Sequence, residues 1–82
     1  MTASLQDQQD HFAHCIQVFG GIAASSRRLG IDERALRRFI NGERPLSATL
    51  LEDTAKALRT VIAEATSAEA RLSAVLADLP EA

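Results

Sequence analysis

The chain has 82 residues, of which 46% are hydrophobic and 24% charged, and its formal net charge is −2. This length predicts one domain with a small core, and the composition is typical of a folded protein rather than a disordered one. A large enzyme is excluded, as is a membrane protein, because no apolar run approaches the roughly 18 residues that a membrane helix needs. Cys15 is the only cysteine, so we expect no internal disulfide and a reducing, cytoplasmic location. Met1–Asp10 lacks a basic start followed by an apolar block, so no secretory signal is expected.

The charges are distributed unevenly along the chain. Residues 1–26 carry −2, residues 27–44 carry +3 from six arginines and three acids, and residues 45–82 carry −3. A basic middle segment between acidic ends indicates a localised anionic partner rather than general attraction to anionic surfaces. The alternative is that the arginines only solvate helix surfaces, and charge alone leaves both interpretations open.

Every periodic segment predicts a helix, and none predicts a strand. We expect the first helix from about Ser4 to Phe19, with Ser4 as N-cap and Asp7 in an acidic variant of the capping box. Gly20-Gly21 should end this helix, because glycine disfavours helix interiors. Its apolar face is spaced for one side of a helix and consists of Leu5, Phe12, Ile16 and Phe19.

Two short helices should follow, separated by a glycine turn. The second is expected from about Ile22 to Leu29, with Gly30 ending it in a left-handed conformation. Asp32 should cap the third helix, which runs from Glu33 to about Asn41, because its carboxylate can accept from free amide groups. This third helix has two faces: Leu36, Phe39 and Ile40 on one, and Arg34, Arg37, Arg38 and Asn41 on the other.

The last segment carries a heptad-like apolar seam. After the N-cap Ser47, apolar or small residues recur at spacings of three and four from Leu51 to Leu79. Thr66-Ser67 could cap a new helix, so we favour two helices with a bend, while one continuous helix remains open. Residues 1–66 would then form the main domain and 67–82 a helical extension. The predicted dimer or partner interface is Leu58, Val61, Ile62, Leu72, Val75, Leu76 and Leu79.

A helix, a glycine turn and an arginine-faced helix form the sequence pattern of a helix-turn-helix, whose second helix enters the major groove of DNA. Arginine suits this role because its planar fork binds guanine O6 and N7 together, and asparagine can reach an adenine edge. We therefore predict base contacts by Glu33, Arg34, Arg37, Arg38 and Asn41. The arginines beside this helix are predicted to contact phosphates and are Arg27, Arg28 and Arg44.

The segment from Ile22 to Pro45, IAASSRRLGIDERALRRFINGERP, resembles the lambda-repressor-like, Cro-type helix-turn-helix of bacterial and phage regulators. The resemblance covers about residues 12–62 and implies an all-α domain of four or five helices that binds operator DNA, with the motif at about 22–41. It also implies that Asp32, Glu33, Arg34, Arg37 and Arg38 face the groove. The sequence departs from the pattern at Ser26, where alanine usually packs, and at Ser25, where an apolar residue is common. The matching packing positions are Leu29, Gly30, Ile31, Leu36 and Phe39.

These patterns predict a sequence-specific transcription regulator that binds double-stranded DNA as a homodimer, cytoplasmic and nucleoid-associated when bound. The alternative is an antitoxin-like or adaptor module whose C-terminal helices bind a partner protein. An enzyme is not expected, because no catalytic constellation can be assembled.

No metal or other cofactor is expected either. Asp7, His11, His14 and Cys15 do not have the spacing of a structural zinc site, and His14 and Cys15 point about 100° apart on a helix. Gly20-Gly21 lacks the lysine and hydroxyl residue of a phosphate-binding loop.

Overall fold

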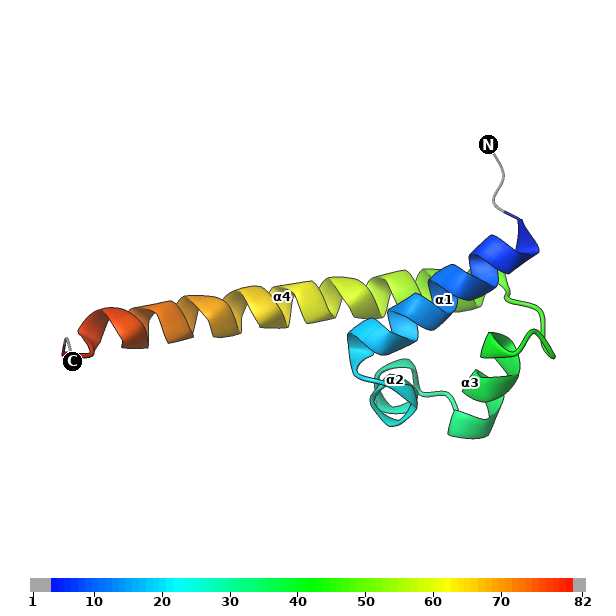
Figure 1. Ribbon diagram of the computed structural model, residues 1–82, viewed down its shortest axis with the longest axis horizontal. Helices are drawn as coiled ribbons and strands as arrows, with labels where there is room; N and C mark the ends of the chain where they lie inside the picture. Colours follow the sequence, from blue (N-terminus) through cyan, green and yellow to red (C-terminus); the bar gives the residue numbers. More distant parts are fainter. Residues whose placement is uncertain (1–3, 81–82) are drawn as a thin grey trace.

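Four helices, α1 to α4 in chain order, account for the part of the chain that the computed structural model describes, residues 4–80 (Figure 1). These residues contain no strand, which confirms the all-α prediction for this part of the chain. Helices α1 and α2 pack on the first half of α4, α3 packs on α1 and α2, and the second half of α4 extends away from them (Figure 1). The molecule is therefore elongated, with extents of 54 × 31 × 22 Å.

Helix α1 spans Leu5–Phe19 and begins as the sequence predicts. The Ser4 hydroxyl accepts from the Asp7 amide at 3.0 Å, and the Asp7 carboxylate accepts from the Ser4 amide, so the capping box is complete. Gly20 ends α1 in the left-handed region at φ 109°. The cap and the break were both predictable, because each depends on residues close together in the sequence.

Helix α2 spans Ile22–Leu29 and helix α3 spans Glu33–Ile40. Gly30, at φ 67°, ends α2 and lets the chain turn directly into α3. Asn41 is the C-cap of α3, so the predicted end of this helix is right to within one residue. Asp32 occupies the predicted N-cap position, but its side chain makes no capping hydrogen bond. The carboxylate role predicted for Asp32 is therefore not seen, and the residue is exposed.

Helix α4 spans Ala48–Asp78 without interruption, so the preference for two helices with a bend is wrong. Thr66 explains the difference, because its hydroxyl donates to the carbonyl oxygen of Ile62 at 2.8 Å instead of capping a new helix. No break in the helix marks a boundary between the predicted segments 1–66 and 67–82, whose outer ends at 1–3 and 81–82 lie outside the described residues. The predicted N-cap Ser47 accepts from the Leu50 amide at 3.1 Å.

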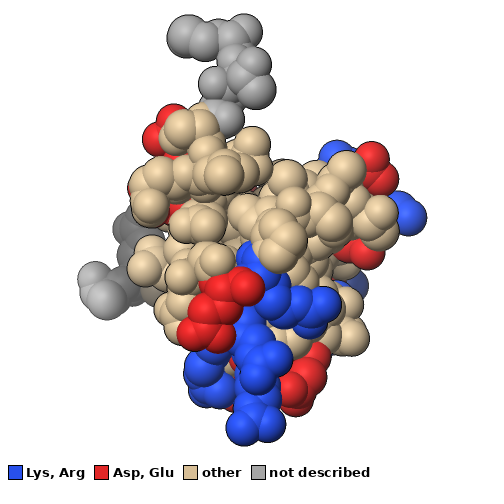
Figure 2. Space-filling model, turned by 90° about the vertical axis from the view of Figure 1, so that its right-hand side faces the viewer, with Lys and Arg blue, Asp and Glu red and all other residues tan. Residues whose placement is uncertain are grey.

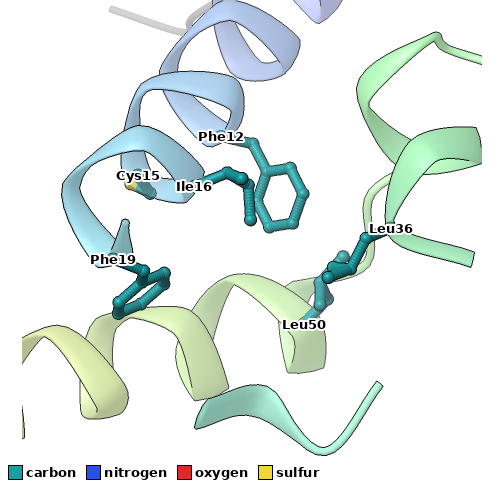
Figure 3. Packing of buried hydrophobic residues seen from close by; sticks show 6 residues of the cluster. All are labelled: Phe12, Cys15, Ile16, Phe19, Leu36 and Leu50. Carbon is teal, nitrogen blue, oxygen red and sulfur yellow. The ribbon is translucent and has the colours of Figure 1, made fainter. Parts of the chain in front are cut away.

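The core lies where α1 crosses the other three helices. Leu36 of α3 is fully buried, and Leu50 of α4 is buried with it (Figure 3). Phe39 packs edge-on against Phe12, with ring centroids 6.3 Å apart. Burial therefore fixes one face of α3 and leaves the opposite face free. The buried apolar cluster is Phe12, Cys15, Ile16, Phe19, Leu36 and Leu50.

The packed part of α4 ends near Val61. Leu58 and Val61 are half-buried against the core, whereas every residue from Ile62 to Pro80 is exposed. About half of α4 thus projects beyond the domain (Figure 1), and Glu64 at its start forms an ion pair with Arg28 of α2.

Candidate functional site

The outer face of α3 carries the arginines that are predicted to contact bases. Arg34, Arg37 and Arg38 are exposed, and Leu36 between them anchors the helix from the buried side. Figure 2 shows Lys and Arg side chains gathered on the lower part of this end of the molecule, with acidic groups beside them. Asn41, one residue beyond α3, is also exposed, and Glu33 is half-buried. The five residues predicted to contact bases therefore all lie on α3 or at its C-cap.

Two of these arginines have weak local partners. Arg37 lies 3.4 Å from Glu33, one turn earlier, and Arg38 lies 3.9 Å from Glu43 in the following turn. Arg34 forms no ion pair with any described residue. Exposed pairs of this kind contribute about 0–1 kcal/mol, so an incoming anion can replace them at little cost. The pairs orient the guanidinium groups without neutralising the face.

Arg44 is positioned by an aromatic ring. Its guanidinium carbon lies 5.0 Å from the centre of the Phe39 ring, within the range of a cation–π contact. Phe39 belongs to α3 and packs on the core. This contact holds the Arg44 charge beside α3.

Arg28 is directed toward α4. It forms an ion pair with Glu64 at 2.6 Å, between residues 36 positions apart, with side-chain exposures of 33% and 58%. Its charge is thus partly neutralised at the point where α4 leaves the domain. Arg27, its neighbour in the chain, is exposed and forms no ion pair with another described residue. Of the three predicted phosphate contacts, Arg28 is the one that the structure ties to another role.

Two serine hydroxyls form hydrogen bonds in α2, just before the turn to α3. The Ser25 side chain is completely buried, and its hydroxyl donates to the carbonyl oxygens of Gly21 at 2.7 Å and Ile16 at 3.3 Å. The Ser26 hydroxyl donates to the carbonyl oxygen of Ile31 at 2.6 Å, across the turn between α2 and α3. Both departures from the resembled pattern are therefore accommodated, because each hydroxyl finds an acceptor.

An apolar groove, which was not predicted from the sequence, lies between α1 and α4. It has a volume of about 420 Å³ and is open to solvent on one side. Burial raises the pKa of the Cys15 thiol at its floor, and a backbone hydrogen bond partly offsets this effect. The α4 residues that line the groove are Leu51, Thr54, Ala55 and Leu58. All of them except Ala55 belong to the predicted heptad seam, which was the available signal.

The residues considered for zinc do not come together as a ligand set. The His11 and His14 rings are exposed, with centroids 6.5 Å apart, while Cys15 points into the buried cluster. Residues 4–80 contain no group of three potential metal ligands of the His, Cys, Asp or Glu type.

Comparison of the chain with protein-family models, curated proteins and solved structures found no significant match. Within the described part of the chain, no helix combines the length and the apolarity needed to cross a bilayer.

Proposed function

We propose that this chain is a sequence-specific, DNA-binding transcription regulator of the lambda-repressor-like type, which inserts α3 into the major groove as one half of a cytoplasmic homodimer. The observation that carries the proposal is the division of α3 into two faces, with Leu36 fully buried and the arginines on the other side exposed. The major groove is about 12 Å wide and admits one helix with long donor side chains on its outer face.

The proposed roles follow from position. Arg34, Arg37 and Arg38 project from successive turns of α3 and suit bidentate contacts to guanine. Asn41, at the end of the helix, suits an adenine edge, and Glu33 at its start suits a cytosine amino group. Arg27 and Arg44 flank α3 and suit phosphate contacts, which fix the orientation of the protein on the duplex.

The net charge of −2 also bears on the proposal. An acidic chain gains little from non-specific attraction to DNA, so binding must depend on the local charge around α3. This favours a protein that selects particular sites over one that coats DNA. The acidic side chains that offset the arginine face include Glu33 and Glu43.

Selection from a random-sequence duplex library, at one fixed salt concentration near the physiological value, tests the proposal directly. We expect enrichment of a defined sequence, with guanines at positions protected by α3. The salt must be fixed because log K falls with log salt by about 0.9 for each neutralised phosphate. A bound pool with no enriched sequence would contradict the proposal.

The second candidate function is that of an adaptor that holds a partner protein with α4. It is favoured by the large exposed side chains beyond the domain, which are 55–63% exposed at Ile62, Leu72, Val75, Leu76 and Leu79. Deleting residues 67–82 separates the two functions. Loss of a protein partner with DNA binding unchanged would favour the adaptor, whereas loss of operator affinity together with self-association would favour the regulator.

A further inference from the structure

The projecting half of α4 carries an apolar stripe, defined here as Ile62, Leu72, Val75, Leu76 and Leu79. Each of these side chains is more than half exposed, with fractions between 55% and 63%. They continue the same side of α4 that packs on the core at Leu50 and Thr54. An isolated helix of this kind would not leave five large apolar side chains in water, so the stripe requires a partner.

The spacing of the stripe fits pairing with another helix. Positions 58, 61, 65, 68, 72, 75 and 79 alternate between spacings of three and four, which is the a and d pattern of a coiled coil. Ala65 and Ala68 occupy the middle of this pattern and allow two helix backbones to approach closely. Ile62 and Leu76 widen the seam on one side.

The charges beside the seam distinguish the possible arrangements of two copies. In a parallel pair, Glu64 of one copy would face Glu69 of the other, and the repulsion would occur twice. In an antiparallel pair with Ala65 opposite Ala68, Glu64 of each copy faces Arg71 of the other, and both contacts are attractive. If the two antiparallel helices are shifted by one heptad, so that the two-fold axis lies nearer the C-terminus, Arg71 faces Arg71 of the other copy and Glu64 faces its Asp78. Both of these contacts are repulsive. Charge complementarity therefore selects one orientation and one register.

The same register gives the groove between α1 and α4 an occupant. With Ala65 opposite Ala68, Val61 faces Leu72 of the second copy and Leu58 faces its Val75. The next contacts bring Leu76 and Leu79 of the second copy to Ala55 and to the edge of the groove beside Thr54, which is itself buried. The groove is mainly apolar, and its α4 side belongs to the same seam as the stripe. The exposed end of one copy thus meets the unfilled groove of the other.

We propose that two copies of this chain associate through antiparallel α4 helices, with Glu64 of each copy paired to Arg71 of the other. In this dimer the C-terminal end of each α4 lies in the α1–α4 groove of the opposite copy. The paired region runs from about Thr54 to Leu79 and is about 38 Å long, from a rise of about 1.5 Å per residue. A two-fold axis crosses it between Ala65 and Ala68, so each apolar contact occurs twice.

This dimer gives a structure to the homodimer of the proposed function and rests on that proposal to this extent. Its formation does not depend on DNA. Arg28 already pairs with Glu64 within each chain. Addition of Arg71 from the second copy would place the Glu64 carboxylate between two guanidinium groups. The domain and the dimer seam would then be linked at the point where α4 leaves the core.

Charge exchange at the seam tests the proposal in the full chain. Arg71→Glu and Glu64→Arg each place two like-charged pairs across the dimer seam, so we expect each variant alone to dimerise about tenfold more weakly than the wild type. Glu64→Arg also breaks the Arg28–Glu64 pair within each chain, and a solvent-exposed pair of this kind contributes little to stability. An equimolar mixture of the two variants restores both attractive pairs and should form a heterodimer near wild-type affinity. Arg59→Glu is the matched control, because it makes the same charge change on α4 at an exposed position off the seam. Sedimentation equilibrium measures the dissociation constants, and circular dichroism shows that each variant remains helical.

A second measurement checks the orientation. In a Cys15→Ala background, a mixture of Val61→Cys and Leu72→Cys chains should form a mixed disulfide on oxidation. Leu72→Cys chains alone should not, because eleven residues, about 16 Å, separate the two positions along an antiparallel pair, beyond the roughly 7 Å limit for a disulfide.

Three results would overturn the proposal. The first is a wild-type chain that remains monomeric over the whole concentration range. The second is stronger dimerisation by Glu64→Arg, which a parallel pair predicts because the new arginine would face Glu69. The third is a disulfide between two Leu72→Cys chains. None of these experiments contains DNA, so their failure would leave the DNA-binding proposal to its own selection experiment.

Discussion

The Ser26 hydroxyl donates to the carbonyl oxygen of Ile31 at 2.6 Å, which joins the end of α2 to the first residues of the turn before α3. Gly30 and Ile31 also donate their amides to the Ser26 carbonyl, at 2.9 and 3.3 Å. Ser26 thus contacts the turn through both its side chain and its backbone. These bonds act together with the core packing of Leu36 to hold α3, and with it the arginine face, in place.

Replacement of Ser26 by alanine should lower the free energy of unfolding by about 1 kcal/mol, because the Ile31 carbonyl loses its hydroxyl donor in a partly buried position. Ser25→Ala is the matched control and should cost less. The carbonyls that Ser25 contacts also accept backbone amides, from Gly21 to Ile16 at 2.9 Å and from Ser25 to Gly21 at 3.0 Å. Urea denaturation followed by circular dichroism measures the free energy of unfolding of both variants. A larger loss for Ser25→Ala than for Ser26→Ala would contradict this explanation.

Gly30 should tolerate asparagine better than alanine. Its φ of 67° lies in the left-handed region, where a Cβ costs about 1 kcal/mol, and asparagine populates that region more readily than alanine. A Cβ at this position would meet no atom within 4 Å, so the effect is one of backbone conformation and not of crowding. Thermal melting of Gly30→Ala and Gly30→Asn compares the stabilities of the two variants, and we expect the higher melting temperature for Gly30→Asn. Equal melting temperatures would show that the turn can change its conformation.

Helices α1 to α3 could be predicted from the sequence because their ends are encoded locally. Ser4 and Asp7 form a cap three residues apart, and Gly20 and Gly30 stop their helices at the positions where they stand. The two faces of α3 likewise follow from a periodicity within eight residues. The continuity of α4 could not be predicted in the same way, because the Thr66 hydroxyl can either cap a new helix or bond back to Ile62.

Contacts between distant segments were harder to predict. The Arg28–Glu64 pair joins α2 to α4, and the α1–α4 groove depends on the angle at which those helices cross. The ion pair leaves no pattern of spacing in the sequence, and the groove leaves only the part of the heptad seam that lines it. The side chains on the face of α3 could be predicted, but the ion pair of Arg28 with Glu64 could not. The phosphate contact of Arg28 stays a prediction.

Alanine substitution on α3 should separate DNA binding from folding. We expect Arg37→Ala or Arg38→Ala to weaken binding to the selected sequence by roughly tenfold or more, since a bidentate base contact is worth about 1–3 kcal/mol. Both side chains are exposed, and their ion pairs contribute little, so the melting temperature should remain within about 2 °C of the wild type. Arg59→Ala, on the exposed side of α4, is the control and should bind normally. A variant that loses its helical circular dichroism would show that the arginine is needed for folding and would contradict its assignment to DNA binding alone.

The Cys15 thiol should react slowly in the native protein. Its side chain is only 8% exposed, and burial raises its pKa, so less thiolate is present at neutral pH and less of it is accessible. The raised pKa also means that this group stabilises the fold below its unfolded pKa. That contribution is lost as the pH rises through the higher folded value. Alkylation rates at pH 8 should be at least about tenfold lower in buffer than in denaturant. Equal rates would show that the thiol is accessible in the native state.

Removal of the projecting part of α4 should leave a folded domain that no longer self-associates. A chain that ends at Thr66 keeps every residue of the buried cluster, together with the Arg28–Glu64 pair, because the packed part of α4 ends near Val61. It lacks four of the five side chains of the stripe. Full burial of one such side chain is worth about 1.5–3 kcal/mol, so their removal should cost the dimer several kcal/mol.

The melting temperature distinguishes this expectation from simple damage to the domain. For the full chain it should rise with protein concentration, since association stabilises the folded state by mass action. For the shortened chain it should be lower and independent of concentration. A melting temperature that still depends on concentration in the shortened chain would show that the dimer contact does not lie on the projecting half of α4. A shortened chain with no helical circular dichroism would show instead that the domain depends on α4 beyond the residues that it buries.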